Sequence, residues 1–238
     1  MFAPTRIVLP ELLDELDPCD PRATHSRRDL RRVHRAMGSL SILNAAIARL
    51  RLTRRPTRIL ELGAGDGSLL LRLARAQPEW RGVSLTVLDR QELLSDETQD
   101  AFARVGWSLT VMRADVMEWA RRDPPQHFDL CITTLFLHHF NSAALGVLLA
   151  AIAACTDAFV ACEPRRSRVA WLGSKLVWML GANTVTRGDA VKSVEAGFAH
   201  RELTALWPNP HADWRCTEGA APPFTHCFSA VRKRACHG

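Results

Sequence analysis

Tyrosine is absent from the 238 residues, and the longest apolar run, residues 143–155, is short. A membrane-spanning helix needs about 20 apolar residues in succession, so no membrane span is expected. The opening MFAPTRIVLPELLDELDP carries acids early and lacks the basic and then apolar pattern of a secretion signal. These absences favour a cytoplasmic protein.

No two cysteines form a C-x-x-C pair, and their number is odd. Zinc sites and disulfide frameworks usually show such pairs or an even set. Most of the cysteines stand in apolar runs, where free cysteine behaves as a small buried hydrophobic residue. We therefore expect neither a metal site nor a disulfide framework. The cysteines are Cys19, Cys131, Cys155, Cys162, Cys216, Cys227 and Cys236.

Charge of one sign is concentrated in one segment. The composition, 47% hydrophobic and 24% charged, is that of an ordinary globular protein, and the net charge is +6. Residues 1–21 hold five acids and one arginine, whereas residues 22–58 hold eleven arginines and a single acid, Asp29. The rest of the chain is neutral, so the whole excess comes from the basic segment 22–58.

Apolar residues at helical spacing open the chain. They predict a short helix over Leu9–Leu16 and a longer helical run over Ser26–Leu50. Gly38 and Ser39 should divide the longer run into two helices.

Pro56 marks a boundary, since helices usually end before a proline. We assign residues 1–55 to an N-terminal helical lid and residues 56–238 to a second domain. Within the second domain, the alternating pattern stops after the last expected parallel strand, and a different region follows from Pro164 to about Gly197. Residues 214–234 predict two strands around a Gly/Pro turn.

After Pro56, short apolar runs alternate with helical ones. Strands that alternate with helices predict βαβ units, hence a mostly parallel sheet covered on both faces. The expected strands are Arg58–Leu62, Ser84–Leu88, Leu109–Arg113, Phe128–Thr133 and Ala158–Cys162. The expected helices are Ser68–Ala76, Ser95–Val105, Val116–Arg122 and Ser142–Cys155.

A glycine loop joins the first expected strand to the helix that follows. In ELGAGDG, the strand runs into Gly63, Gly65 and Gly67 and continues directly as a helix. Glycine permits a sharp turn and a close approach to a ligand, and a helix N-terminus offers unpaired N–H groups. Because ligands bind beyond the carboxyl ends of the strands in such sheets, the loop predicts a binding site.

Acidic residues end the next two strands. Asp89 can accept two hydrogen bonds from a ribose diol, and Asp115, beside the apolar Val116, can meet the edge of an adenine. Either acid alone would more often cap a helix, but the succession of a glycine loop and two acids favours a nucleoside ligand. The dinucleotide fingerprint G-x-G-x-x-G requires glycine where Ser68 stands, which disfavours NAD.

In order, ELGAGDG, VLDR, RADV and FDLCITTLFLHHF resemble the class I S-adenosylmethionine-dependent methyltransferases. Leu137-His138-His139 is most similar to the small-molecule enzymes of the ubiquinone- and menaquinone-biosynthesis type. The motifs cover residues 56–163. The resemblance implies an α/β, Rossmann-like, doubly wound and mostly parallel seven-stranded sheet, with an antiparallel C-terminal hairpin and extra N-terminal helices.

The resemblance also implies S-adenosyl-L-methionine as cofactor and a set of binding residues. Glu61 and the glycine loop would line its methionine and ribose portions, and Thr133–Leu135 would face its methionine end. Asp89 would hold the ribose hydroxyls, with Arg90 beside the adenine. The implied cofactor-binding residues are Glu61, Gly63, Ala64, Gly65, Asp66, Gly67, Asp89, Arg90, Asp115, Val116, Thr133, Thr134 and Leu135.

His138 and His139 are the candidate catalytic residues. A hydroxyl acceptor needs a base to remove its proton, and histidine suits that role near neutral pH. The alternative is that one histidine packs against the following helix. Arg165 and Arg166 could clamp an anionic acceptor, although a solvated turn is the simpler interpretation.

The resemblance further implies that an insertion at about 164–197 shapes the acceptor pocket. This insertion carries an apolar stretch at near-helical spacing. Trp171, Trp178, Met179 and Leu180 predict either a wall of the acceptor pocket or an ordinary core helix. An apolar or aromatic acceptor would fit the first of these.

The favoured function is therefore methyl transfer to a small, hydrophobic or aromatic metabolite, with O-methylation favoured. An RNA- or protein-directed methyltransferase that uses the basic segment 22–58 is the first alternative. Neither an NPPY nor a DPPY tetrapeptide follows the fourth strand, and no basic stripe is interleaved with aromatic residues, so a nucleic-acid partner is not favoured. A non-catalytic S-adenosylmethionine-binding protein is the second alternative.

Overall fold

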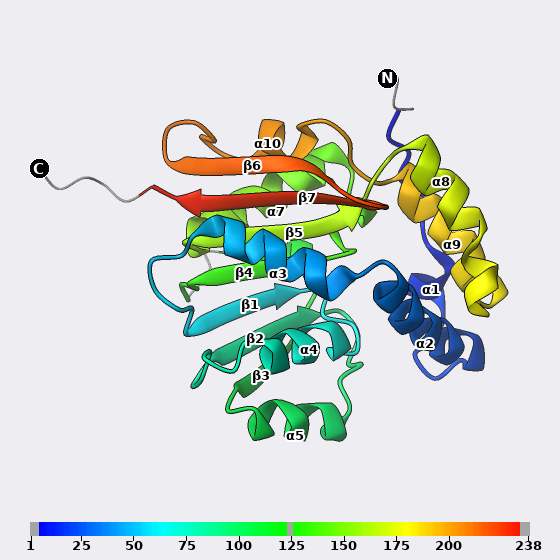
Figure 1. Ribbon diagram of the computed structural model, residues 1–238, viewed down its shortest axis with the longest axis horizontal. Coiled ribbons are helices and arrows are strands. Elements are labelled where there is room, and N and C mark those ends of the chain that lie inside the picture. The colour runs from blue at the N-terminus through cyan, green and yellow to red at the C-terminus, as the bar shows by residue number, and fades with distance from the viewer. Residues whose placement is uncertain (1–4, 123–125, 234–238) are drawn as a thin grey trace, which may run out of the picture.

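A seven-stranded sheet in the order β3-β2-β1-β4-β5-β7-β6 forms the centre of the molecule (Figure 1). The computed structural model describes residues 5–122 and 126–233. Neighbouring strands from β3 to β5 are parallel, whereas β7 is antiparallel to both β5 and β6. The strands are β1 (Arg58–Leu62), β2 (Ser84–Asp89), β3 (Ser108–Arg113), β4 (Leu130–Thr134), β5 (Ala158–Pro164), β6 (Trp214–Ala221) and β7 (Thr225–Arg232). The predicted mostly parallel sheet with a C-terminal hairpin is confirmed.

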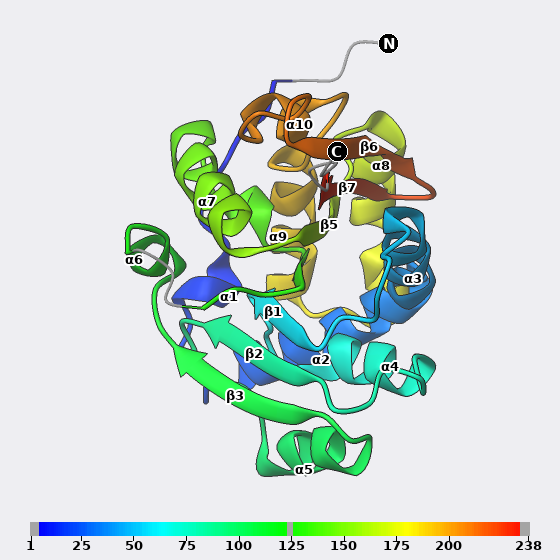
Figure 2. The ribbon, with the colours of Figure 1, turned by 90° about the vertical axis from the view of Figure 1, so that its left-hand side faces the viewer.

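Helices cover both faces of the sheet (Figure 2). One face carries α3 (Ser39–Leu50), α4 (Ser68–Ala76) and α5 (Asp96–Arg104). The other face carries α6 (Val116–Ala120), α7 (Ser142–Cys155) and α10 (Glu202–Leu206). The described residues contain no helix long and apolar enough to cross a membrane.

Alternation along the strands divides the apolar residues between two cores. In β1, Ile59 packs in the core under α3 and α4, whereas Leu60 and Leu62 pack in the core under α7. Successive strand residues point to opposite faces, which is why this buried strand has almost no exposed position. Leu43 of α3 lies in the first core, so α3 belongs to the body of the molecule.

The remaining helices gather beyond the carboxyl ends of the parallel strands (Figure 1). There α9 contacts α1, α2 and α8. A short 3₁₀ turn, η1, follows β4 in the same region. These elements are α1 (Leu12–Glu15), α2 (Pro21–Ala36), η1 (Leu137–His139), α8 (Arg168–Lys175), η2 (Val177–Leu180) and α9 (Thr184–Glu195).

Two predicted boundaries at the N-terminus differ from the structure. The helix expected over Leu9–Leu16 forms only at Leu12–Glu15. The next helix begins at Pro21, earlier than predicted, because Asp20 caps it and proline suits the first helical turn. The predicted break at Gly38 is confirmed, with φ of 66° at this residue.

The apolar insertion is neither a core helix nor a wall of the cavity described below. Val169 is 66% exposed and Met179 is 68% exposed. Trp178 is 54% exposed, and Trp171 lies at the edge of the same surface. Tertiary packing places these residues on the outer side of α8 and η2, so the core-helix interpretation is wrong.

Four cysteines, Cys131, Cys155, Cys162 and Cys227, are buried, as expected for small apolar residues. Cys19 is exposed, and Cys216 is partly buried. The described cysteines form no disulfide, and Cys236 lies outside the described residues.

Candidate functional site

A cavity of about 730 Å³ opens at the carboxyl ends of the parallel strands. It lies where the strand order reverses between β1 and β4, the usual position of ligand sites in doubly wound sheets. The glycine loop after β1 and the ends of β2 and β4 form its floor. The N-terminal segment 8–15 and one side of α2 form its roof.

The glycine loop needs glycine for conformation and for space. Gly63, Gly65 and Gly67 have φ of 71°, 54° and 69°, in the left-handed region that other residues adopt only at a cost. A Cβ on Gly63 would lie 2.2 Å from the ring of Phe136. Gly63 therefore allows the segment after β4 to pack directly on the loop.

Asp89, at the end of β2, holds the glycine loop in place. Its Oδ2 accepts the N–H of Gly65 at 3.0 Å, and its Oδ1 accepts the N–H of Gln91 at 2.9 Å. Burial raises the pKa of this carboxyl, and the backbone donors oppose that shift. The side chain thus lies beside the loop with its position fixed before any ligand binds.

Asp115 caps a helix, the role that a single acid in this position would more often have. Its Oδ1 accepts the N–H of Met117 at 2.7 Å and that of Glu118 at 3.2 Å, at the start of α6. Asp115 and the buried Val116 nevertheless line the cavity.

Glu61, one residue before the end of β1, is a buried acid that lines the cavity. Within the described residues, its Oε2 has no hydrogen-bond partner. Burial raises its pKa to about 8, and the nearby Asp89 and Asp66 add to the shift. A buried carboxyl without a partner is costly, so a cationic ligand group at this position would be stabilised.

His138 is buried between two carboxylates. Its Nδ1 lies 2.9 Å from Glu163 Oε2, and its Nε2 lies 3.3 Å from Glu11 Oε1. Burial lowers the pKa of His138, but the bonds to Glu11 and Glu163 outweigh burial and raise the pKa to about 9. His138 is thus held as a cation near neutral pH.

His139 differs from His138 in two ways: its side chain is more exposed, and a carboxylate binds only one of its ring nitrogens. Its Nδ1 lies 3.2 Å from Asp14 Oδ2, and its side chain is 23% exposed. Among the described residues, Nε2 of His139 has no hydrogen-bond partner. Burial raises the pKa of Asp14, but the hydrogen bond to His139 and the nearby charges of His139, Arg90 and His138 together outweigh burial and lower it.

The segment 5–16, which we call the strap, is tied to the body by polar contacts. Arg6 donates to the carbonyl of Ala196 at 2.7 Å and to that of His138 at 3.1 Å. The buried Asp189 of α9 accepts the N–H groups of Leu12 and Leu13, each at 2.9 Å. These bonds replace the partners that the first N–H groups of a helix lack, which explains why α1 begins at Leu12.

Two more contacts close the strap over the site. Arg90 donates to the carbonyl of Asp14 at 3.1 Å, and Ser193 donates to Glu11. Arg31 of α2 lies 3.3 Å from Asp66 in the glycine loop. The arginine of α2 thus holds the roof against the floor of the cavity.

Most of the residues predicted to bind the cofactor meet around this cavity. Gly67 and Thr133 are the exceptions, since both are buried behind the lining. Oγ1 of Thr133 and of Thr134 are buried without a partner in the described part of the chain. The lining residues among those predicted are Glu61, Gly63, Ala64, Gly65, Asp66, Asp89, Arg90, Asp115, Val116, Thr134 and Leu135.

The predicted arginine clamp does not form. Arg166 is 5% exposed and lies 2.6 Å from Glu202 at the base of α10, away from the cavity. Arg165 does not line the cavity either. Arg166 is neither a ligand for an acceptor nor part of a solvated turn.

Sequence reasoning missed the residues that support the histidines. Glu163 stands at the end of β5, the same edge of the sheet that carries the glycine loop and Asp89, and this placement was a usable signal. Glu11 gave no local signal, because it meets His138 only through a contact between distant segments.

Comparisons with known proteins agree with the fold. Residues 59–157 match the sequence model of the methyltransferase domain family. No curated protein sequence matches the chain.

Solved structures similar to this one cover most of the chain at low sequence identity. The plantazolicin methyltransferase BpumL in complex with SAH is 12% identical, with a TM-score of 0.63 over 90% of this chain and 92% of that chain. The pyocyanin biosynthetic protein PhzM is 20% identical, with a TM-score of 0.58 over 94% of this chain and 62% of that chain.

A third similar structure is the magnesium protoporphyrin IX methyltransferase ChlM from Synechocystis PCC 6803 with bound SAH. It is 16% identical, with a TM-score of 0.52 over 87% of this chain and 86% of that chain. Together, the matched sequence and the observed topology show that this chain carries a methyltransferase domain with the class I, Rossmann-like fold that its motifs predict.

Proposed function

We propose that the protein transfers a methyl group from S-adenosylmethionine to a hydroxyl of a small, hydrophobic or aromatic molecule. The observation that carries this proposal is the cavity at the switch point of the sheet, where the glycine loop, Asp89 and the unpartnered Glu61 converge. When bound, S-adenosylmethionine supplies a methyl group that its sulfonium has already activated.

The residues present fit this cofactor. Glu61 offers a buried acceptor to a cationic ammonium or sulfonium group, and Thr134, which also lines the cavity, offers a buried hydroxyl. Asp89 lies at the end of β2, where a ribose diol can reach the unused lone pairs of its carboxylate. Val116 provides an apolar contact for an adenine ring.

The acceptor would enter under the strap and α2. Apolar side chains line this part of the cavity, and they are Leu9, Leu13, Leu30, Leu93, Phe136 and Phe140. Apolar walls with a few polar groups are typical of sites for small hydrophobic molecules. Closure by the strap would also exclude water from methyl transfer.

His139 is the residue that we propose as general base. Asp14 holds its Nδ1, so that Nε2 can accept a proton from an acceptor hydroxyl, as in other carboxylate-oriented histidines. His138 would act as a positioning residue, because carboxylates bind both of its nitrogens and keep it protonated.

The lid that we propose is smaller than the lid expected from the sequence, residues 1–55. Because α3 packs in the core, the movable part would consist of the strap and α2, residues 5–36. The arginines of α2 that face the body support this role. Arg31 bonds to Asp66, and Arg27 donates to Gln91 at 3.1 Å.

Calorimetry with S-adenosylmethionine, S-adenosylhomocysteine (SAH) and NAD tests the cofactor. We expect the first two to bind and NAD not to bind. Asp89→Asn should weaken cofactor binding by about 1–3 kcal/mol, since a charged acceptor is lost. The exposed Asp100 of α5 supplies the control Asp100→Asn, which should bind normally.

Transfer of a labelled methyl group to a panel of phenols, phenolic acids and amines tests the reaction. His139→Gln should lower kcat on a phenol by about 10²–10⁴-fold while the cofactor Kd stays unchanged. Full activity of this variant on phenols would rule out His139 as the base. Binding of cofactor without turnover on any acceptor would favour a non-catalytic binding protein.

A further inference from the structure

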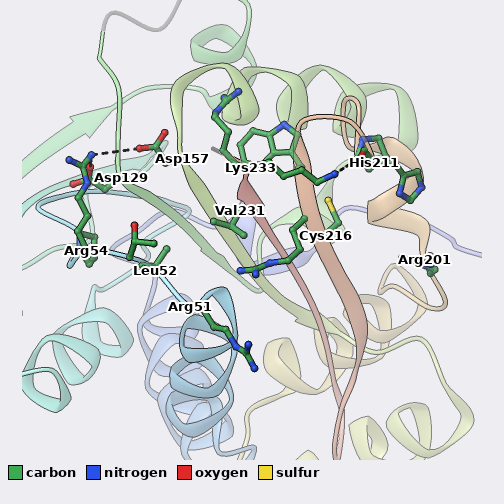
Figure 3. Close-up of a pocket in the computed structure, with 16 residues that line it drawn as sticks. Arg51, Leu52, Arg54, Asp129, Asp157, Arg201, His211, Cys216, Val231 and Lys233 are labelled. Atoms are coloured by element: carbon green, nitrogen blue, oxygen red, sulfur yellow. Dashed lines mark hydrogen bonds and ion pairs between the residues drawn. The ribbon is translucent and has the colours of Figure 1, made fainter. Parts of the chain in front are cut away.

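A second cavity, of about 890 Å³, lies at the amino ends of the parallel strands (Figure 3). The cavity described above lies at the opposite, carboxyl ends of these strands. Three distant stretches of the chain build most of it: residues 51–56 before β1, residues 201–216 around the start of β6, and residues 231–233 at the end of β7. Asp129 and Asp157 complete the lining. The methyltransferase chemistry proposed above uses none of these residues.

Positive charge dominates this second cavity. Its acidic residues are Asp129 and Asp157, and Figure 3 shows both beside Arg54 on one side of the cavity. Arg54 lies 3.2 Å from Asp129 and 3.9 Å from Asp157, so these acids are already paired. The cationic residues of the lining are Arg51, Arg54, Arg201, Arg215, Arg232 and Lys233.

Main-chain carbonyls, and not carboxylates, hold three of these cations. Arg215 donates to the carbonyl of Leu50 at 2.5 Å, and Lys233 donates to that of His211 at 2.6 Å. Arg232 donates to a carbonyl of α7 at 2.5 Å. A carbonyl fixes the position of a cation without neutralising its charge, so the positive charge remains available to a ligand.

Two further arginines on this cavity have no partner. Within residues 5–122 and 126–233, the side chains of Arg51 and Arg201 make neither an ion pair nor a hydrogen bond. Arg51 directly follows Leu50, whose carbonyl accepts from Arg215. Arg201 and Lys233 both oppose the rise in the pKa of the Cys216 thiol that burial causes. Arg51 and Arg201 are exposed, so each adds unpaired positive charge that attracts anions to this cavity.

We propose that this second cavity binds a small molecule that carries several phosphate groups. Guanidinium groups match the geometry of phosphate oxygens and bind them in pairs. The volume lies in the range of small-molecule sites, and Leu52, Pro56 and Val231 offer an apolar surface to the organic part of the ligand.

The distribution of the basic segment 22–58 favours a small ligand over a nucleic acid. The arginines of α2 lie beyond the carboxyl ends of the strands, whereas Arg51 and Arg54 lie at the amino ends, with the length of α3 between them (Figure 1). The basic segment is therefore divided between two ends of the molecule and does not form one continuous track for a phosphate backbone.

Calorimetry with sodium triphosphate and with inositol hexakisphosphate tests the proposal. Neither probe contains an adenosyl group, so neither competes for the cofactor cavity. We expect saturable binding at about 150 mM salt, unchanged by added SAH. Arg51→Ala and Arg201→Ala should each raise the Kd at least about tenfold, because each removes a charged hydrogen-bond donor.

Arg55→Ala is the matched control. It removes the same charge from the same loop, but Arg55 donates to the carbonyl of Glu79 and does not line the cavity. An equal loss of affinity in Arg55→Ala would show general charge attraction and would overturn the proposal. So would the absence of saturable binding of both probes below about 1 mM.

Two further arms address other sources of phosphate. Single-stranded RNA or vesicles containing phosphatidic acid could also carry the anionic group. Binding of either one that depends on Arg201, in a protein that binds neither small probe, would overturn the small-molecule site. We expect the two small probes to bind, and neither RNA nor vesicles to bind. Because these assays measure no methyl transfer, their outcome is independent of the function proposed for the other cavity.

Discussion

Nδ1 of His138 lies 2.9 Å from Oε2 of Glu163, and the two side chains are 3% and 0% exposed. The same carboxylate accepts the backbone N–H groups of Phe136 at 3.1 Å and of Leu137 at 3.0 Å. Glu163 thus fixes the whole turn η1, from the end of β5, and sets the position of His139 at the cavity. Glu11 of the strap completes the arrangement on the other side of His138.

The His138 pair predicts a pH limit on stability. The pKa of His138 in the folded protein is about 9, above the ordinary value of 6.5. The contribution of this pairing to the free energy of unfolding is therefore full below pH 6.5 and is lost as the pH rises through 9. His138→Gln should lower stability by about 3–5 kcal/mol, since it removes the buried cation that pairs with the carboxylates of Glu163 and Glu11. Melting curves between pH 6 and 10 should show an alkaline loss in the wild type that this variant lacks.

The matched control for that experiment is His127→Gln. His127 lies 3.5 Å from Asp157 on the surface, where an ion pair contributes little. An identical effect of the two substitutions would contradict the role given to His138.

Glu61 predicts that the protein releases a proton when the cofactor binds. With a pKa of about 8, its carboxyl is mostly protonated at pH 7. A cationic ligand group favours the ionised form, so binding should release close to one proton at pH 7 and should tighten as the pH rises towards 8. Calorimetry in two buffers with different heats of ionisation measures this number. Glu61→Gln should abolish the release, and an unchanged release would assign the proton to another group.

The strap predicts that loosening it lowers turnover of the acceptor without weakening cofactor binding. Asp189→Ala removes the acceptor of the N–H groups of Leu12 and Leu13, so α1 should detach from α9 more often. We expect kcat/KM for the acceptor to fall about tenfold or more, with the cofactor Kd unchanged, because the glycine loop is not touched. Limited proteolysis should cut within residues 5–16 faster than in the wild type. Asp100→Ala, on the far side of the molecule, is the control, and equal turnover of the two variants would argue against a lid.

Gly63 and Gly65 form a matched pair for the glycine loop. Both have positive φ, but a Cβ on Gly65 meets nothing within 4 Å, whereas one on Gly63 meets Phe136 at 2.2 Å. Gly65→Ala should cost about 1–2 kcal/mol for the left-handed conformation alone. Gly63→Ala should cost about 1–3 kcal/mol more, because it also forces the ring to move. Urea unfolding compares the stability of the two variants. Equal losses of stability would mean that the ring of Phe136 moves aside at no cost.

Where the local sequence pattern is strong, both ends of the helix or strand could be predicted from the sequence. The strand Arg58–Leu62 and the helices Ser68–Ala76 and Ser142–Cys155 occur as predicted. Each combines continuous or periodic apolar residues with a turn or cap at its end, such as Asn141, which caps α7. Such signals act between neighbouring residues, so they survive in any tertiary context.

The position of the apolar stretch after β5 was not predictable. Its near-helical spacing does predict helical turns, and α8 and η2 form there. Whether their apolar side chains face the core depends on where α9 and α2 pack, and these helices leave Trp178 and Met179 on the surface.

By itself, the sequence determined the parallel sheet, the glycine loop and the acids at the strand ends, because backbone geometry and side-chain alternation are local properties. Only the tertiary structure decided that Glu11 lies against His138, that Asp189 holds the strap, and that the basic segment is divided between opposite ends of the molecule. The first two of these features are contacts between residues more than 100 positions apart, so their formation depends on the packing of the whole chain and leaves no periodic trace in the sequence.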